Sequence, residues 1–217
     1  MKHTTILLDI ETQCDFLQPG GSCYSPAAAE AARQVRRLFG WARMNGIRVV
    51  STVLRVRRHQ KGPLADVPHC IEGTQGEMKL PGTVLSRRID LGLRNTTDLP
   101  RGIFRDYQQV IVEKRGTDIF AHARLERLIT ELPIATFVIC GAGVAKGIFQ
   151  AAVGLRNRGF GVIVACDAIL DLDDKFAPMA RARMEAKGVI FVPTCEIVEP
   201  KPARHLAPFR MPAHASR

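Results

Sequence analysis

Short apolar runs alternate with longer amphipathic segments along most of the chain. The apolar runs have the length of buried strands and cover residues 4–10, 47–53, 109–113, 135–140, 161–165 and 189–192. Apolar residues recur at helical spacing over residues 26–45, 121–131, 144–158 and 173–187, and a glycine or proline follows each of these segments. This alternation predicts a three-layer, Rossmann-like α/β fold, with a six-stranded, mostly parallel sheet and helices on both of its faces.

Two stretches interrupt the pattern. Residues 57–104 are rich in proline, glycine and charge, and we interpret them as a long excursion between two strands. Residues 199–217 contain four prolines and no periodicity, which predicts an extended or disordered basic tail. We therefore expect one domain over residues 1–198, followed by that tail.

Length and composition are typical of a globular protein. The chain has 217 residues, of which 46% are hydrophobic and 24% charged. It contains no apolar run of about 18 residues, as a membrane span requires, and its first apolar run is too short for a signal peptide. We expect a cytoplasmic protein that is not bound to a membrane.

The formal net charge is +10, but its distribution argues against a nucleic-acid partner. The basic residues are spread along the chain and are not interleaved with aromatic residues. Such a field also attracts small acidic substrates, and we expect a small-molecule ligand. The six cysteines are scattered without a CxxC pair, so we expect free thiols and neither a disulfide framework nor a zinc cluster.

Polar residues follow three of the predicted strands. The first strand leads to Asp9, Glu11, Gln13 and Asp15, the third to Lys114, and the fourth to a turn of small residues that contains Gly147. In parallel sheets, ligands bind beyond the carboxyl ends of the strands. The functional site is therefore predicted where these three segments meet.

These segments resemble the motifs of the isochorismatase-like hydrolases, also called the cysteine hydrolase superfamily. The first contains Gln13-Cys-Asp15-Phe16, the second runs from Lys114 to Phe120, and the third is the strand, turn and helix of residues 137–159. The resemblance implies that Lys114 is the catalytic lysine, and it places Glu11 at the position of the catalytic Asp. Gly147 stands at the position of the nucleophilic Cys.

The departure at Gly147 closes the usual covalent route, because glycine has no side chain that could form a thioester. The resemblance implies further that the amides of Gly143 and Gly147 form an oxyanion hole. It also implies a cis peptide bond between Ala142 and Gly143. Phe16 and Phe120, the aromatic residues of the first two motifs, are expected at the substrate site.

The two acidic residues of the first segment have alternative interpretations. Asp9 and Glu11 are two residues apart, so a regular strand would place both on one face, where their charges repel. Such a pair suits a general acid, because repulsion raises the pKa of one carboxyl group. Alternatively, Asp9 forms hydrogen bonds with structural groups and Glu11 only forms an ion pair. Lys114 needs a partner if it is buried, and Glu11 is the expected one.

A metal site is not expected. Residues 67–77 resemble a nicotinamidase stretch in which the residue at the position of His69 is a metal ligand. Two further ligand positions after the second strand are occupied by Leu54 and Val56, and a single imidazole does not make a zinc or iron site. We predict no cofactor, with His69 ordering its loop or contacting substrate.

The leading hypothesis is a metal-independent, isochorismatase-like hydrolase with a degenerate triad. It would act on a small anionic metabolite without a covalent cysteine intermediate, using Glu11 and Lys114 as an acid–base pair. An alternative is an inactive family member that binds a small molecule or a protein. A third possibility is an amidase of the nicotinamidase type with another nucleophile. Relatives form dimers or tetramers, so we expect a homodimer or homotetramer.

Overall fold

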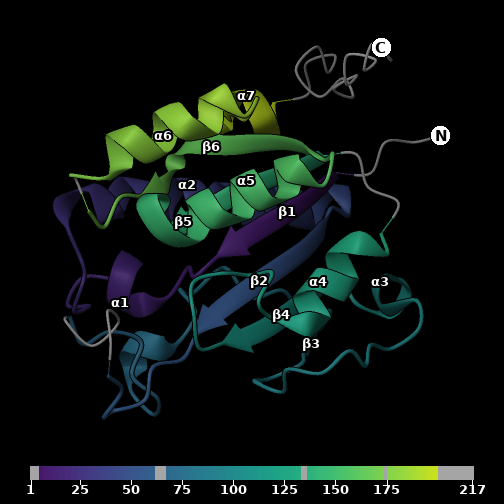
Figure 1. Ribbon diagram of the computed structural model, residues 1–217, viewed down its shortest axis with the longest axis horizontal. Helices are drawn as coiled ribbons and strands as arrows, with labels where there is room; N and C mark the ends of the chain where they lie inside the picture. Colours follow the sequence, from purple (N-terminus) through teal and green to yellow (C-terminus); the bar gives the residue numbers. More distant parts are fainter. Residues whose placement is uncertain (1–4, 62–66, 133–135, 174, 200–217) are drawn as a thin grey trace, which may run out of the picture.

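A computed structural model describes residues 5–61, 67–132, 136–173 and 175–199, and it confirms the predicted α/β class (Figure 1). Its sheet has seven strands in the order β3-β4-β2-β1-β5-β6-β7, and every neighbouring pair is parallel. The strands are β1 (Thr5–Ile10), β2 (Arg48–Leu54), β3 (Arg88–Asp90), β4 (Gln109–Lys114), β5 (Thr136–Ala142), β6 (Gly161–Leu170) and β7 (Ile190–Val192).

The seventh strand, β3, corrects the predicted number of six. It lies inside the stretch interpreted as an excursion and pairs with β4 at the edge of the sheet. Its three residues include no apolar run, because Arg88 and Asp90 are exposed and only Ile89 faces the core. A short, charged edge strand discourages pairing with another chain, and it carries no sequence signal of a buried strand.

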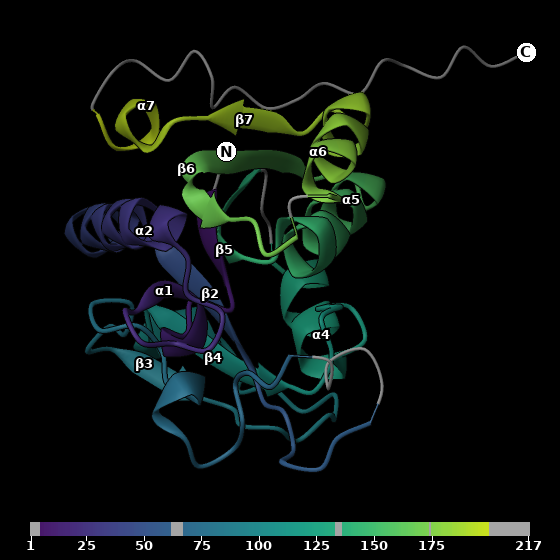
Figure 2. The same ribbon diagram turned by 90° about the vertical axis from the view of Figure 1, so that its left-hand side faces the viewer.

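Helices cover both faces of the sheet, as Figure 2 shows edge-on. One face is covered by α2 (Pro26–Asn45) and α7 (Thr194–Val198), and the other by α4 (Ala123–Thr130), α5 (Phe149–Asn157) and α6 (Ala177–Ala186). Three short helices lie in connections: α1 (Cys14–Leu17), η1 (Gln75–Glu77) and α3 (Ile103–Asp106). A π-helical turn, η2 (Val144–Ile148), leads directly into α5.

The core has three parts that follow from this layering. The largest lies between the sheet and α4, α5 and α6, and includes Ile6, Leu8 and Ile10 of β1. The second lies under α2, where Leu7 of β1 packs with Val35 and Phe39. Alternate residues of β1 thus face opposite cores, so β1 is buried on both faces. The third part lies beyond the strand ends, around α1 and the start of α2.

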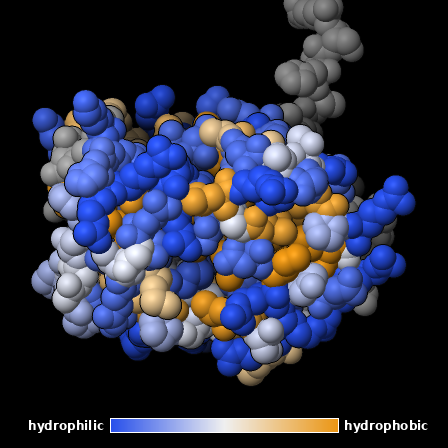
Figure 3. Space-filling model, turned by 90° about the horizontal axis from the view of Figure 1, so that it is seen from below, coloured by the Kyte–Doolittle hydropathy of each residue, from blue (hydrophilic) through white to orange (hydrophobic). Residues whose placement is uncertain are grey.

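The underside of the molecule, on the side of β3, mixes hydrophilic and hydrophobic residues (Figure 3). Hydrophobic residues gather in the middle and on the right of that view, with hydrophilic residues around them. Among the described residues, no helix is long and apolar enough to cross a membrane. Residues 200–217, nearly all of the expected tail, lie outside the described residues.

Candidate active site

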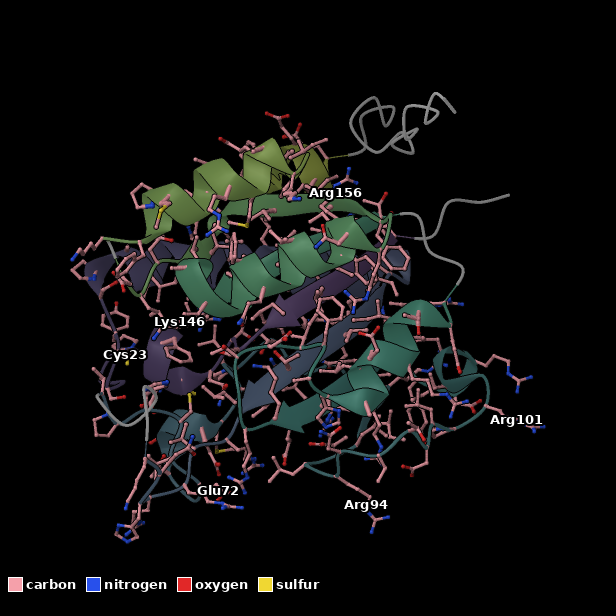
Figure 4. The ribbon with its side chains drawn as sticks, viewed as in Figure 1. Cys23, Glu72, Arg94, Arg101, Lys146 and Arg156 are labelled. Carbon is pink, nitrogen blue, oxygen red and sulfur yellow. The ribbon has the colours of Figure 1, made fainter. Side chains whose placement is uncertain are left out.

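A cavity of about 440 Å³ lies beyond the carboxyl ends of the strands. The end of β2 and the segments after β1, β2, β4, β5 and β6 contribute to it. Its lining consists of Glu11, Phe16, Ser22, Cys23, Tyr24, Leu54, Val67, His69, Thr117, Gly143, Ala145, Lys146, Gly147, Leu172 and Asp173. In Figure 4 this region is marked by the labels of Cys23 and Lys146, at the left-hand end of the molecule. This is the position at which ligands bind in parallel sheets, as the sequence predicts.

Glu11 enters the cavity because the backbone leaves the strand conformation at this residue. Its φ of 53° is left-handed, which is uncommon for a residue other than glycine. The Glu11 amide donates to Thr52 Oγ1 at 3.2 Å, which fixes this turn against β2. The side chain is thereby brought to the face of the sheet on which Lys114 lies. Only 3% of Glu11 is exposed, so its carboxylate is held in a largely water-excluded setting.

Lys114 forms an ion pair with Glu11, and all of its hydrogen-bond donors are in use. Its Nζ donates to the Glu11 carboxylate, to the carbonyl of Gly116 at 2.7 Å and to that of Thr117 at 3.3 Å. An ammonium group has three N–H donors, so none remains for a substrate. Lys114 lies behind Glu11 and lines a neighbouring cavity of about 500 Å³, together with His122. It can stabilise the charge of Glu11, but it is not placed to bind a ligand in the first cavity.

Asp9 lies outside the cavity, on the opposite face of the sheet from Glu11. It is fully buried and pairs with Lys79 at 2.5 Å, and Lys79 also donates to Thr12 Oγ1 at 2.7 Å. The expected repulsion between Asp9 and Glu11 on one face is therefore wrong. The left-handed turn at Glu11 breaks the strand alternation, and each carboxylate has its own lysine.

Gly147 faces Glu11 across a short distance. A Cβ atom added to Gly147 would lie 3.5 Å from Glu11 Oε1, 3.6 Å from the Thr117 carbonyl oxygen and 3.1 Å from Ile10 Cγ2. The position that the family resemblance assigns to a nucleophile is thus directly beside the acidic group. With glycine there, no side chain of residue 147 enters the cavity, which both Glu11 and Gly147 line.

The turn before Gly147 differs from the expected oxyanion hole. Gly143 has a left-handed φ of 82°, and its amide donates to the Leu170 carbonyl at 3.0 Å, so it is not free for a substrate oxygen. The peptide bond between Ala142 and Gly143 is trans, like every described peptide bond, which corrects the expected cis bond. The left-handed glycine makes the turn in its place. Ala142 is buried at the end of β5 and does not line the cavity.

Of the two aromatic residues expected at the substrate site, one lines the cavity and the other does not. Phe16 lines the cavity and lies against His69, with ring centroids 5.4 Å apart. His69 Nδ1 is 2.5 Å from the Val67 carbonyl, so His69 both orders its loop and lines the cavity. Phe120 lies elsewhere: it stacks under the guanidinium of Arg158 at 3.8 Å and packs against α5.

The remaining polar residues of the first motif hold the loops around the cavity. The Gln13 side-chain amide bonds both backbone groups of Leu54, at 2.8 Å each. Asp15 accepts from the amide of Cys70 at 2.6 Å and from that of Ser22 at 3.1 Å. Asp15 therefore joins the loop that carries His69 to the loop that carries Cys23 and Tyr24.

The sequence did not single out Cys23, Tyr24, Asp173 or Lys146 as site residues. Burial raises the pKa of the Cys23 thiol, and the charges of Asp15 and Lys146 act on it in opposite directions. A raised thiol pKa is the reverse of what an activated nucleophile needs. Lys146 did carry a signal, because it is a charged residue immediately before Gly147 in an otherwise small or apolar segment.

The donor set does not fit a catalytic metal. Leu54 and Val56, at the positions of two expected ligands, are buried apolar residues, and His69 is the only imidazole among the described residues that line the cavity. Across the described ranges, no group of three or more His, Cys, Asp or Glu side chains is arranged to hold a metal ion. Metal independence itself stays a prediction.

Comparison with known proteins supports the family resemblance. Residues 96–196 match the family model described as the Isochorismatase domain. A sequence search of curated proteins found no match. The matched segment contains β4, the turn with Gly147 and α5, and so includes both Lys114 and Gly147.

Solved structures show the same fold over most of the chain. Nicotinamidase/pyrazinamidase PncA from Bacillus subtilis is 20% identical, with a TM-score of 0.67 over 87% of this chain and 99% of that one. An isochorismatase family protein from Desulfovibrio vulgaris is 19% identical, with a TM-score of 0.67 over 90% and 97%. N-carbamoylsarcosine amidase from Thermoplasma acidophilum is 16% identical, with a TM-score of 0.66 over 88% and 96%. The chain thus has the fold of the isochorismatase-like hydrolases.

Proposed function

We propose that this protein is a metal-independent hydrolase of small anionic metabolites, in which Glu11 transfers protons and no covalent intermediate forms. The observation that carries the proposal is the placement of Glu11. Glu11 lines the cavity beside Gly147, which has no side chain, and its carboxylate is bound by Lys114. A positioned carboxyl group in a site with little water suits general acid–base catalysis.

The geometry supports a simple proton cycle for an enol ether, the bond that isochorismatases cleave. The cycle starts from the form of the site in which Glu11 carries a proton. Glu11 gives this proton to the methylene carbon of the substrate, which leaves a cation on the adjacent carbon. Water adds to that carbon and returns a proton to the Glu11 carboxylate. The hemiketal then separates into a ketone and an alcohol. Lys114 stabilises the negative charge that Glu11 acquires when it gives up its proton, which lowers the barrier of the first step.

The alternatives make different demands on the same site. An inactive binding module needs the cavity but no proton transfer. An amidase of the nicotinamidase type needs a nucleophile, and Cys23 is the only cysteine in the described lining of the cavity. The raised thiol pKa of Cys23 argues against that role.

The test is release of pyruvate from isochorismate by the purified protein, compared with Lys114→Met. Methionine keeps the length of the side chain and removes the charge. The proposal expects turnover by the wild type, unchanged after thiol alkylation, and a loss of about 100-fold or more in kcat for Lys114→Met. Loss of turnover on alkylation would favour the amidase. No turnover of isochorismate by folded wild type would contradict the proposal and favour the binding module.

A further inference from the structure

The cavity has one cationic side chain whose charge is not used by the protein. Lys146 is exposed, lines the cavity and directly precedes Gly147. Among the described residues it forms no ion pair and no side-chain hydrogen bond, whereas every N–H of Lys114 is occupied. Figure 4 shows the labels of Lys146 and Cys23 close together at this end of the molecule, and both residues line the same cavity.

The other charged groups of the cavity define where an anion can bind. Glu11 is 3% exposed and is paired with Lys114, so neither residue offers an unpaired positive charge to an anion. Asp173 is also in the lining, but its Oδ1 accepts from the amides of Lys175 and Phe176 at the start of α6, at 3.1 and 3.3 Å. No Lys146–Asp173 ion pair forms within the described part of the chain. Lys146, the exposed lysine of the lining, therefore offers the cavity an unpaired positive charge.

The lining also contains several apolar or aromatic side chains. Phe16 and Leu54 are nearly fully buried, and Tyr24 and Val67 are more exposed. A ligand with a flat apolar body and one anionic group matches this distribution. Its anionic group would lie at Lys146 and its body against Phe16, with the end nearest Glu11 uncharged.

We infer that Lys146 determines substrate specificity by binding a carboxylate of the substrate, so that the reacting bond lies inward at Glu11 and Gly147. The inference rests on the proposed function for the reaction, but the carboxylate site itself can be tested without turnover. It assigns the anion-binding role to Lys146 and not to Lys114. It also predicts that neutral amides of the same shape bind less well than carboxylates.

The test compares benzoate with benzamide, which have the same shape and differ in charge. Each is titrated against the wild type and Lys146→Met by NMR, with Arg94→Met as a control for the loss of one positive charge. Arg94 is exposed and lies away from Lys146, on the lower right in Figure 4. We expect Lys146→Met to weaken benzoate binding roughly fivefold and to leave benzamide unchanged, because the charge is partly screened by water. Arg94→Met should change neither affinity.

Several results would overturn the inference. Equal benzoate affinity in wild type and Lys146→Met would do so, as would an equal loss for both ligands or no binding of benzoate at millimolar concentration. Adding salt should weaken benzoate binding and not that of benzamide, and equal effects would also contradict it. Glu11→Gln separates this inference from the proposed function. That variant should lose turnover and keep the preference for benzoate.

Discussion

The proposed chemistry depends on one residue, Glu11, whose backbone conformation places it against Lys114. A carboxylate one methylene longer than the Asp of the family pattern reaches the lysine because the chain turns into the left-handed region at that position. Gly147, which lines the same cavity, has no side chain that could act as a nucleophile. These two departures from the family pattern lie next to each other, which supports the proposed reaction with water.

A thiol introduced at position 147 should report the basicity of Glu11. In Gly147→Cys the new Cβ would lie 3.5 Å from Glu11 Oε1, after Ile10 Cγ2 moves by a few tenths of an ångström. We expect site-specific alkylation of the new thiol by iodoacetamide, followed by mass spectrometry, to slow by about 100-fold when Glu11→Gln is added. Alkylation of Cys23 serves as the internal control. An unchanged rate at position 147 would show that Glu11 does not act as a base there.

His122 gives the structure a specific pH dependence. Its ring is 4% exposed, and neither ring nitrogen has a hydrogen-bond partner among the described residues. Burial lowers its pKa, with smaller contributions in the same direction from Arg124 and Lys114. In the unfolded chain the His122 imidazole binds a proton near pH 6.5. In the folded chain it does so only at lower pH, because burial lowers its pKa. Its contribution to stability is complete above about pH 6.5 and is lost as the pH falls through the folded pKa.

Urea denaturation at pH 7.5 and pH 5.5 measures this effect. We expect the wild type to lose up to about 1 kcal/mol more unfolding free energy than His122→Phe between the two pH values. Phenylalanine keeps a ring in the buried space and does not titrate. The same pH-dependent loss in both proteins would assign the effect to other groups.

At the scale of elements, the loops around the cavity are tied together through α1. Asp15 accepts backbone hydrogen bonds from Ser22 and Cys70, which are far apart in the sequence. The Gln13 side chain connects the same segment to the end of β2 through two hydrogen bonds with the Leu54 backbone. The first motif thus supplies the proposed proton donor, Glu11, and two residues that hold the loops around the cavity.

Asp15→Asn should loosen these walls. Asparagine has one acceptor oxygen where aspartate has two, so one buried amide loses its partner, and the free energy of unfolding should fall by about 1–3 kcal/mol. Because the loops that carry Tyr24 and His69 lose their connection, KM should rise more than kcat falls. A variant as stable as wild type, or one with kcat reduced at constant KM, would contradict this role.

The elements also show what the sequence could predict. Long periodic segments such as α2 and α5 and the apolar runs β1 and β5 were found, because burial imposes a clear period on them. The edge strand β3 and the short helices α1 and α3 were not, since three or four residues carry no period. At the site, motif spacing located Glu11, Lys114 and Gly147, but not the turn that separates Asp9 from Glu11. That turn depends on the contact with Thr52, 41 residues away in the sequence.

At the scale of the whole molecule, the sheet brings the ends of β1, β2, β5 and β6 to one edge, and the cavity lies there (Figures 1 and 4). The net charge of +10 favours the approach of anions, and Lys146 is the residue of the cavity lining that we propose to bind them. The expected homodimer or homotetramer and the absence of a nucleic-acid partner stay predictions. They require light scattering and DNA-binding measurements on the full chain.

The central claim is that Glu11 performs the proton transfers of a hydrolysis without a covalent intermediate. Its most direct test is the kcat of pyruvate release from isochorismate for wild type and Glu11→Gln, with folding checked by circular dichroism. Glutamine keeps the shape of the side chain and cannot exchange a proton, so kcat is predicted to fall by about 100- to 10,000-fold. A folded Glu11→Gln variant with wild-type kcat, or a wild type that releases no pyruvate, would contradict the account.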